Sequence, residues 1–214
     1  MVHQNRPLST LLLYAFPAIG LAALTLPLYV VVPTFYAESL GLSVQSIGLA
    51  LLAVRLFDAV NDPVFGWLSD RWHPTLGRRR LWFVAFVPVA VWGAFKLFWP
   101  PLDVDVTYLF LWSLVLSIGY TGAILPYTAW GAELDTTYSG RSRISSLREG
   151  FVLVGTLLAI SVPFTVGWAD PNRVHGLAYL AIGIVAFLPI SAAIAVWRVP
   201  EPWDYSNKRL SLID

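Results

Sequence analysis

Three ionisable side chains, Arg55, Asp58 and Asp62, interrupt a stretch of sequence that is otherwise apolar. If the stretch is a helix, its rotation of about 100° per residue places the three within about 60° of one another. Arg55 can then pair with Asp58, and Asp62 follows one turn later with Asn61 beside it. The group carries one negative charge in excess. A bound monovalent cation or a proton would neutralise it.

These charges are costly if the stretch crosses a membrane, at about 2.5–3.5 kcal/mol each near the centre of a spanning helix. Carboxylate and amide oxygens are hard ligands, which suit Na⁺ or Li⁺ as well as H⁺. The segment therefore predicts a cation site. The alternative is a structural ion pair between Arg55 and another span, with the remaining carboxylate hydrogen-bonded to neighbouring helices.

The composition of the chain indicates which elements position this group. Of its 214 residues, 57% are hydrophobic and 13% are charged, against about 25% charged residues in a soluble domain. The apolar residues form blocks long enough to cross a bilayer. We predict an all-α membrane protein with six transmembrane helices, near residues 9–35, 44–69, 81–99, 106–130, 147–168 and 175–197. The bundle then covers residues 9–197, with an N-terminal segment at 1–8 and a tail or linker at 198–214.

The basic residues are distributed unevenly about these spans. Cationic loops stay in the cytoplasm, and the side with few basic residues carries only Lys96 and Arg173. We therefore expect a multi-pass protein of the inner (plasma) membrane, surrounded by lipid, with both termini cytoplasmic. The basic residues of the cytoplasmic side are Arg6, Arg71, Arg78, Arg79, Arg80, Arg141, Arg143, Arg148, Arg198, Lys208 and Arg209.

Several classes of function have no support in the sequence. The chain has no cysteine, which excludes disulfides, thiolate metal sites and cysteine nucleophiles. It has no His-Glu-x-x-His metal motif, no Gly-x-Ser-x-Gly elbow and no nucleotide P-loop. We expect no enzymatic activity, no cofactor and no nucleic-acid partner.

The residues around the charged group follow a recognisable order. They read Arg55-Leu56-Phe57-Asp58-Ala59-Val60-Asn61-Asp62-Pro63, then Gly66, Asp70-Arg71 and Gly77-Arg78-Arg79-Arg80-Leu81-Trp82, and a later span adds Gly119-Tyr120-Thr121 and Pro126-Tyr127. This order resembles the glycoside–pentoside–hexuronide:cation symporter family. The segment from Gly66 to Arg80 also resembles the general major facilitator motif, in which an Asp and basic residues latch the cytoplasmic gate.

The resemblance implies roles for individual residues. It implies Asp58, Asn61, Asp62 and Thr121 as cation ligands, with Asp58 and Asp62 holding the metal if the cation is Na⁺. Tyr120 would line the cavity near cation and substrate. Residues for charge balance or gating would be Arg55, Asp70, Arg71, Arg78, Arg79 and Arg148.

Three positions of the expected substrate cavity depart from the sugar-binding members. Ala22 and Ile124 stand where those members have an Asp, and Thr128 stands where an aromatic residue is expected. A polar sugar would lose its principal acceptors here. Sugar remains the family expectation, and a less polar substrate is the alternative.

The family fold has twelve spans in two halves, so six spans correspond to its N-terminal half. The chain would be a fragment, or would pair with a separately encoded second half, or would form a homodimer about an axis along the membrane normal. The expected function is symport of a small solute with Na⁺ or H⁺ by alternating access. The alternative is a non-transporting membrane subunit or scaffold, or an inactive truncated half.

Overall fold

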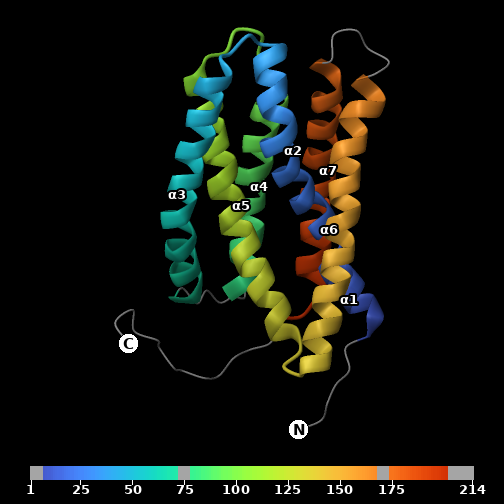
Figure 1. Cartoon of the computed structure of the whole chain (residues 1–214). Helices are drawn as coiled ribbons and strands as arrows, with labels where there is room; N and C mark the ends of the chain where they lie inside the picture. Colours follow the sequence, from blue (N-terminus) through green and yellow to red (C-terminus); the bar gives the residue numbers. More distant parts are fainter. Residues whose placement is uncertain (1–6, 72–77, 168–173, 202–214) are drawn as a thin grey trace.

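The computed structural model describes residues 7–71, 78–167 and 174–201. In these ranges the chain forms α-helices joined by short connections (Figure 1). Their bounds are α1 Leu8–Ala15, α2 Ala18–Glu38, α3 Val44–Arg71, α4 Arg78–Phe98, α5 Val106–Leu134, α6 Tyr138–Gly167 and α7 Val174–Arg198.

Six spans among the described residues are long and apolar enough to cross a membrane, with α1 and α2 together forming the first, Leu8–Glu38. The break between α1 and α2 falls at Phe16 and Pro17, because a proline inside a helix has no N–H to donate and crowds the preceding turn. The predicted all-helical membrane fold is thus confirmed. The predicted segments 1–8 and 198–214 lie largely outside the described residues.

The predicted spans agree with the helices to about one turn except at the start of α6. The prediction began this span at residue 147, whereas the helix begins at Tyr138. The first turns of α6 carry Arg141, Arg143 and Arg148. A hydropathy window detects only the part of a helix that is apolar, so it misses a polar extension of the same helix.

Helices α4 and α5 pack closely because small residues lie between them. A Cβ added at Gly119 would lie 2.2 Å from the backbone nitrogen of Ala90, and one at Gly93 would lie 2.7 Å from that of Leu116. Small residues let helix backbones approach within a membrane. Helix α5 in turn contacts α3, and α6 contacts α2 and α7. The core therefore runs through α2, α4, α5 and α7.

Helices α3 and α6 lie at opposite edges of the bundle (Figure 1) and bury the smallest share of their residues. Their outer surfaces are apolar. The large exposed apolar residues on α3 include Leu49, Leu52, Leu56, Val60 and Val64, and those on α6 include Leu153, Leu157, Leu158 and Phe164.

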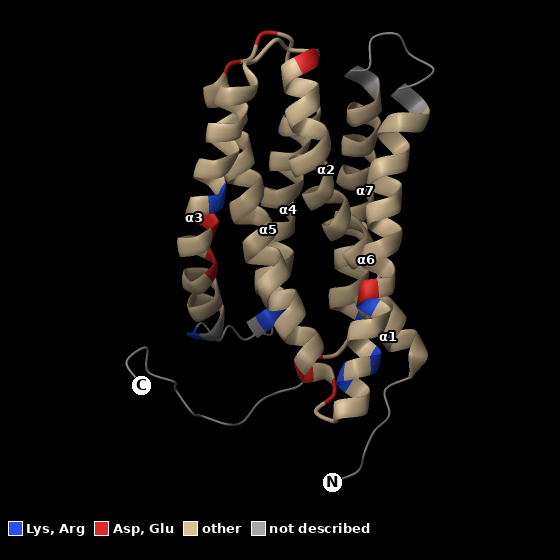
Figure 2. Cartoon of the chain, viewed as in Figure 1, with Lys and Arg blue, Asp and Glu red and all other residues tan. Residues whose placement is uncertain are grey.

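The start of α1 and the end of α7 lie at one end of the bundle, and Lys and Arg gather at that end (Figure 2). At the other end, Asp105 caps α5 by accepting a hydrogen bond of 2.8 Å from the backbone N–H of Tyr108. This hydrogen bond lowers the pKa of Asp105. A negatively charged cap is favourable at a helix N-terminus.

Candidate cation and substrate site

Midway along α3, Asp58 and Asp62 face a cavity of about 480 Å³ between α2, α3 and α5. We call it the first cavity. The two carboxylates share a face because they lie four residues apart on one helix. Its lining residues include Thr25, Tyr29, Arg55, Asp58, Asp62, Leu116, Ser117, Tyr120 and Thr121.

Each carboxylate accepts a hydrogen bond from a hydroxyl group of α5. Thr121 Oγ1 donates to Asp62 Oδ1 over 2.9 Å, and Ser117 Oγ donates to Asp58 Oδ1. The residues of both pairs are 59 positions apart in the sequence. Two residues four apart on α3 thus meet two residues four apart on α5, so one helix supplies the charges and the other the hydroxyls.

Arg55 turns to an aromatic ring rather than to a carboxylate. Its Cζ lies 3.8 Å from the centre of the Tyr29 ring, where the electron-rich face of the ring attracts a cation. Among the described residues, Arg55 forms no ion pair within 4.0 Å. Among these residues the ion pair of the structural alternative is absent, and the carboxyl groups of Asp58 and Asp62 both face the cavity.

Asn61 lies beside this group but does not line the first cavity. Its side chain is buried, and its Nδ2 has no hydrogen-bond partner among the described residues. Its place among the cation ligands stays a prediction.

The described residues contain no group of three or more His, Cys, Asp and Glu side chains that could hold a metal ion. Two carboxylates with hydroxyl neighbours suit a monovalent cation better than Zn²⁺ or Ca²⁺, which need more charged or softer ligands. The arrangement can therefore take up one small positive charge.

A second cavity of about 280 Å³ adjoins the first, and Thr25 and Tyr120 line both. The structure brings together here all the residues proposed for the substrate cavity. They are Ala22, Tyr120, Ile124 and Thr128, and Arg148 lies with them.

The lining of the second cavity is mainly apolar with a few polar groups. Arg148 forms an ion pair of 2.6 Å with Glu149, and the hydroxyl of Thr128 donates to the carbonyl oxygen of Leu125. Thr25 and Thr156 add further hydroxyls. An apolar cavity with a few placed polar groups is typical of small-molecule sites.

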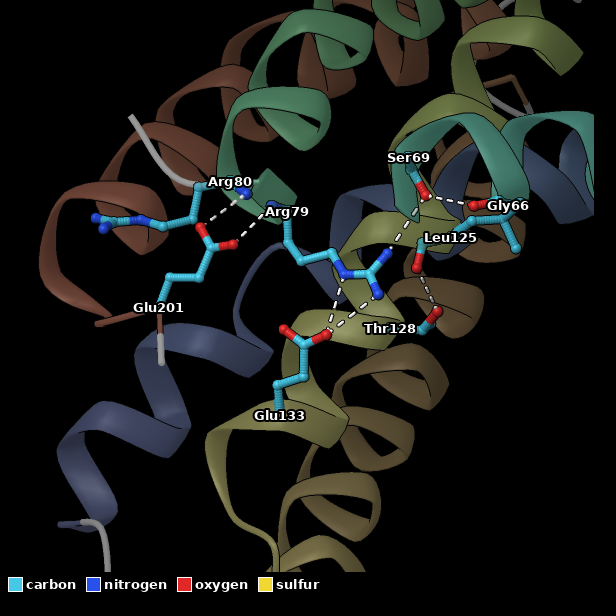
Figure 3. Close-up of polar contacts among 8 residues, drawn as sticks. All are labelled: Gly66, Ser69, Arg79, Arg80, Leu125, Thr128, Glu133 and Glu201. Atoms are coloured by element: carbon cyan, nitrogen blue, oxygen red, sulfur yellow. Dashed lines mark hydrogen bonds and ion pairs between the residues drawn. The ribbon is translucent and has the colours of Figure 1, made fainter. Parts of the chain in front are cut away.

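The basic end holds a separate polar cluster, which we call the basic-end cluster and which consists of Ser69, Arg79, Glu133 and Glu201 (Figure 3). Arg79 donates from Nε and Nη2 to Glu133 Oε1, over 3.2 and 3.1 Å, and from Nη1 to Ser69 Oγ over 3.3 Å. The carboxylate of Glu201 accepts the backbone N–H groups of Arg79 and Arg80 at the start of α4. The cluster joins the ends of α3, α4, α5 and the segment after α7.

The other gating predictions have different positions. Arg71 lies over the ring of Trp67, with 5.0 Å between Cζ and the ring centre. The side chains of Asp70 and Arg78 lie outside the described residues. The predicted latch is therefore described only through Arg71 and Arg79.

Sequence reasoning missed Ser117, Glu133 and Glu201. Ser117 had a usable signal, because it lies four residues before Thr121 and so shares its face of a helix. Glu133 and Glu201 had no such signal in the sequence, since they contact residues at the start of α4 that are more than 50 positions away.

With this geometry in view, comparison with known proteins identifies the family. Residues 13–211 match the family described as MFS/sugar transport protein. The chain belongs to this family. An uncharacterized symporter of Synechocystis is 29% identical over 65% of this chain and 27% of its own length. The isoprimeverose transporter of Lactiplantibacillus pentosus is 25% identical over 69% of this chain and 32% of its own length. A putative glycoside/cation symporter of Escherichia coli is 28% identical over 70% of this chain and 34% of its own length.

The matched region covers about a third of the length of these relatives. That share, the match to the family and the six spans agree with the N-terminal half that the resemblance implies. Membership of a transporter family also agrees with the expectation of a non-enzyme.

Proposed function

We propose that this chain is the cation-binding half of a secondary symporter that moves a small solute together with Na⁺ or H⁺. The observation that carries the proposal is the pair Asp58 and Asp62, which face a cavity in the middle of a membrane span and form no ion pair with any residue that the structure describes. Charges so placed are costly unless a ligand neutralises them. Cation binding relieves this cost, so it favours the conformation that holds the cation best.

The second cavity is the proposed solute site. It adjoins the cation site through Thr25 and Tyr120, so cation and solute can each alter the side chains that the other contacts. Relatives named as isoprimeverose and glycoside transporters support a sugar, and the apolar residues Ala22 and Ile124 support a less polar solute. The substrate class is therefore a sugar or another small organic solute.

A complete carrier needs a second six-helix half, because substrate is held between two halves in this fold. The exposed apolar faces of α3 and α6 flank the cavities and are the surfaces we assign to it. A Cβ added at Gly48 or Gly66 of α3 would meet no atom within 4 Å, so a partner helix can approach closely there. The second half is the rest of a longer chain, a separate chain, or a second copy.

The mass of the purified complex tests this assembly. We would express the chain from its genomic context, extract it in mild detergent and identify every protein that copurifies by mass spectrometry. A second six-span half, on the same or another chain, or a homodimer would support a carrier. A lone unstable monomer would indicate an inactive half.

Uptake by that complex tests the coupling. In proteoliposomes supplied with a glycoside panel that includes isoprimeverose, a Na⁺ or H⁺ gradient should accelerate uptake, and Asp58→Asn and Asp62→Asn should abolish the acceleration. Asp103→Asn makes the same chemical change at an exposed residue between α4 and α5 and should change nothing. Gradient-driven uptake that survives both site substitutions would refute the cation assignment. Loss of assembly with no effect of ions would indicate a scaffold.

We also propose that the basic end faces the cytoplasm, following the positive-inside rule. The chain contains no cysteine, so single cysteines can report its orientation. Leu102 and Tyr138 are 83% and 91% exposed and lie at opposite ends. A membrane-impermeant maleimide should label Leu102→Cys in intact cells and Tyr138→Cys only after permeabilisation. The reverse pattern would overturn the orientation.

A further inference from the structure

Helices α3 and α5 face each other in a regular ladder across the first cavity. A constant offset of 59 residues pairs Asp58 with Ser117 and Asp62 with Thr121. The helices run in the same direction, from the end of the bundle that carries Asp105, which we call the acidic end, to the basic end. One further turn toward the acidic end, the same offset places Val54 opposite Ser113. The ladder therefore sets a carboxylate against a hydroxyl at two successive steps, and an apolar side chain against a hydroxyl at the next.

The two hydroxyls have equivalent surroundings. Ser117 and Thr121 are both buried, line the first cavity and donate to one carboxylate oxygen each. A hydroxyl has one proton to donate and two lone pairs to offer. It can thus stabilise a carboxylate before a cation arrives and turn a lone pair to the cation afterwards.

The number of oxygen atoms that Asp58, Asp62, Ser117 and Thr121 bring to the first cavity helps to decide between Na⁺ and a proton. A proton needs one carboxylate oxygen, whereas hard metal cations are held by several oxygen ligands. Two carboxylates and two hydroxyls together carry six oxygens, and all four side chains line the same cavity. Two buried hydroxyls add nothing that a proton site requires.

We propose that Ser117 is a ligand of the transported cation and that, with Thr121, it makes the site selective for Na⁺ over a proton. This rests on the proposed function and adds to it a ligand and a choice of ion. Asp58 and Asp62 supply the charge, and the hydroxyls of α5 complete the coordination. Ser117 also links α3 to α5 through the cation, so loading the site would draw the walls of the first cavity together.

The test is equilibrium binding of ²²Na⁺ to the purified full complex. Ser117→Ala removes one oxygen ligand and should raise the Kd for Na⁺ about tenfold, the effect expected when a charged group loses one hydrogen-bonding partner. Ser117→Thr keeps the hydroxyl and should retain most of the affinity. Ser117→Cys keeps nearly the size of serine but offers a soft sulfur in place of the hydroxyl oxygen, so it should weaken Na⁺ binding as alanine does. This variant separates the loss of the oxygen ligand from any effect of the smaller alanine side chain on packing.

Ser113→Ala is the matched control. Ser113 is the same residue type on the same helix one turn away, fully buried, and its Oγ has no partner among the described residues. Its substitution should leave the Kd unchanged.

The possible results separate the two proposals. Asp62→Asn should abolish ²²Na⁺ binding, and if it does not, the cation site itself is wrong. If Asp62→Asn abolishes binding but Ser117→Ala leaves the Kd unchanged, the Ser117 assignment alone is refuted. If the parent complex takes up protons but binds no ²²Na⁺, the selectivity for Na⁺ is refuted while the symporter proposal stands.

Discussion

Two clusters in this chain are built from the same chemical groups and reach opposite arrangements. In the basic-end cluster, the guanidinium of Arg79 meets Glu133 and Ser69, and all three lie among packed helix ends. Midway along α3, the guanidinium of Arg55 lies over Tyr29, and nearby Asp58 and Asp62 receive only hydroxyl hydrogen bonds.

The difference teaches how a charge that ties helices together can be told from one that is available to a ligand. An arginine that meets a carboxylate is neutralised within the protein and ties its helices together. Carboxylates that form no ion pair with the nearby arginine are, under the proposed function, balanced by an incoming cation. Both clusters contain an arginine, carboxylates and a serine. They differ in what the arginine contacts, which is a carboxylate for Arg79 and an aromatic ring for Arg55.

The largest effect on stability should come from Glu133→Gln. This change removes the negative charge that lies 3.1 Å from the nearly buried guanidinium of Arg79 and should lower the free energy of unfolding by about 2 kcal/mol. Thermal unfolding in detergent measures it, and ²²Na⁺ affinity should stay unchanged. Loss of Na⁺ affinity in a folded Glu133→Gln variant would show that the two clusters are not independent.

Asp62→Asn should act in the opposite direction. Without cation, it removes one of two neighbouring negative charges and should raise the free energy of unfolding by about 1 kcal/mol. Thermal unfolding in choline buffer measures the gain, and Na⁺ should stabilise the parent chain but not the variant. A loss of stability comparable to that of Glu133→Gln would mean that Asp62 is a structural residue.

Tyr29→Leu should make the middle of α3 resemble the basic-end cluster. Without the ring, Arg55 is free to pair with Asp58 three residues away. Because a cation–π contact is worth about 0.5–1 kcal/mol at an accessible site, Na⁺ affinity should fall about threefold. Tyr29→Phe keeps the ring and is the control. Equal affinities for the two variants would contradict a role for the ring in holding Arg55.

The smallest effect should come from Glu201→Gln. The substitution weakens the cap on the backbone N–H groups of Arg79 and Arg80 by about 0.5 kcal/mol. Hydrogen exchange should therefore quicken about twofold at those two amides. Glu149→Gln, on α6, is the control and should leave them unchanged. Unaltered exchange in Glu201→Gln would show that Glu201 does not hold the start of α4.

The predictions from sequence succeeded where the signal was local. Hydropathy located the six spans, since the length of an apolar block reports on a bilayer directly. The shared face of Asp58 and Asp62 followed from helical periodicity. The start of α6 was placed too late because its first turns are charged. The spacing of Ser117 from Thr121 was a usable local signal, but the contact of Ser117 with Asp58 joins two different helices and could not be read from the sequence.

The sequence by itself determined that the chain is a helical membrane protein with an excess of carboxylate charge in one span, because span length, amphipathic periodicity and the cost of buried charge are properties of local segments. Only the tertiary structure decided which groups meet. The approach of α5 to α3 set the hydroxyls against the carboxylates, and that of α2 set Tyr29 beneath Arg55. Those pairings depend on how helices pack, which involves residues far apart in the chain.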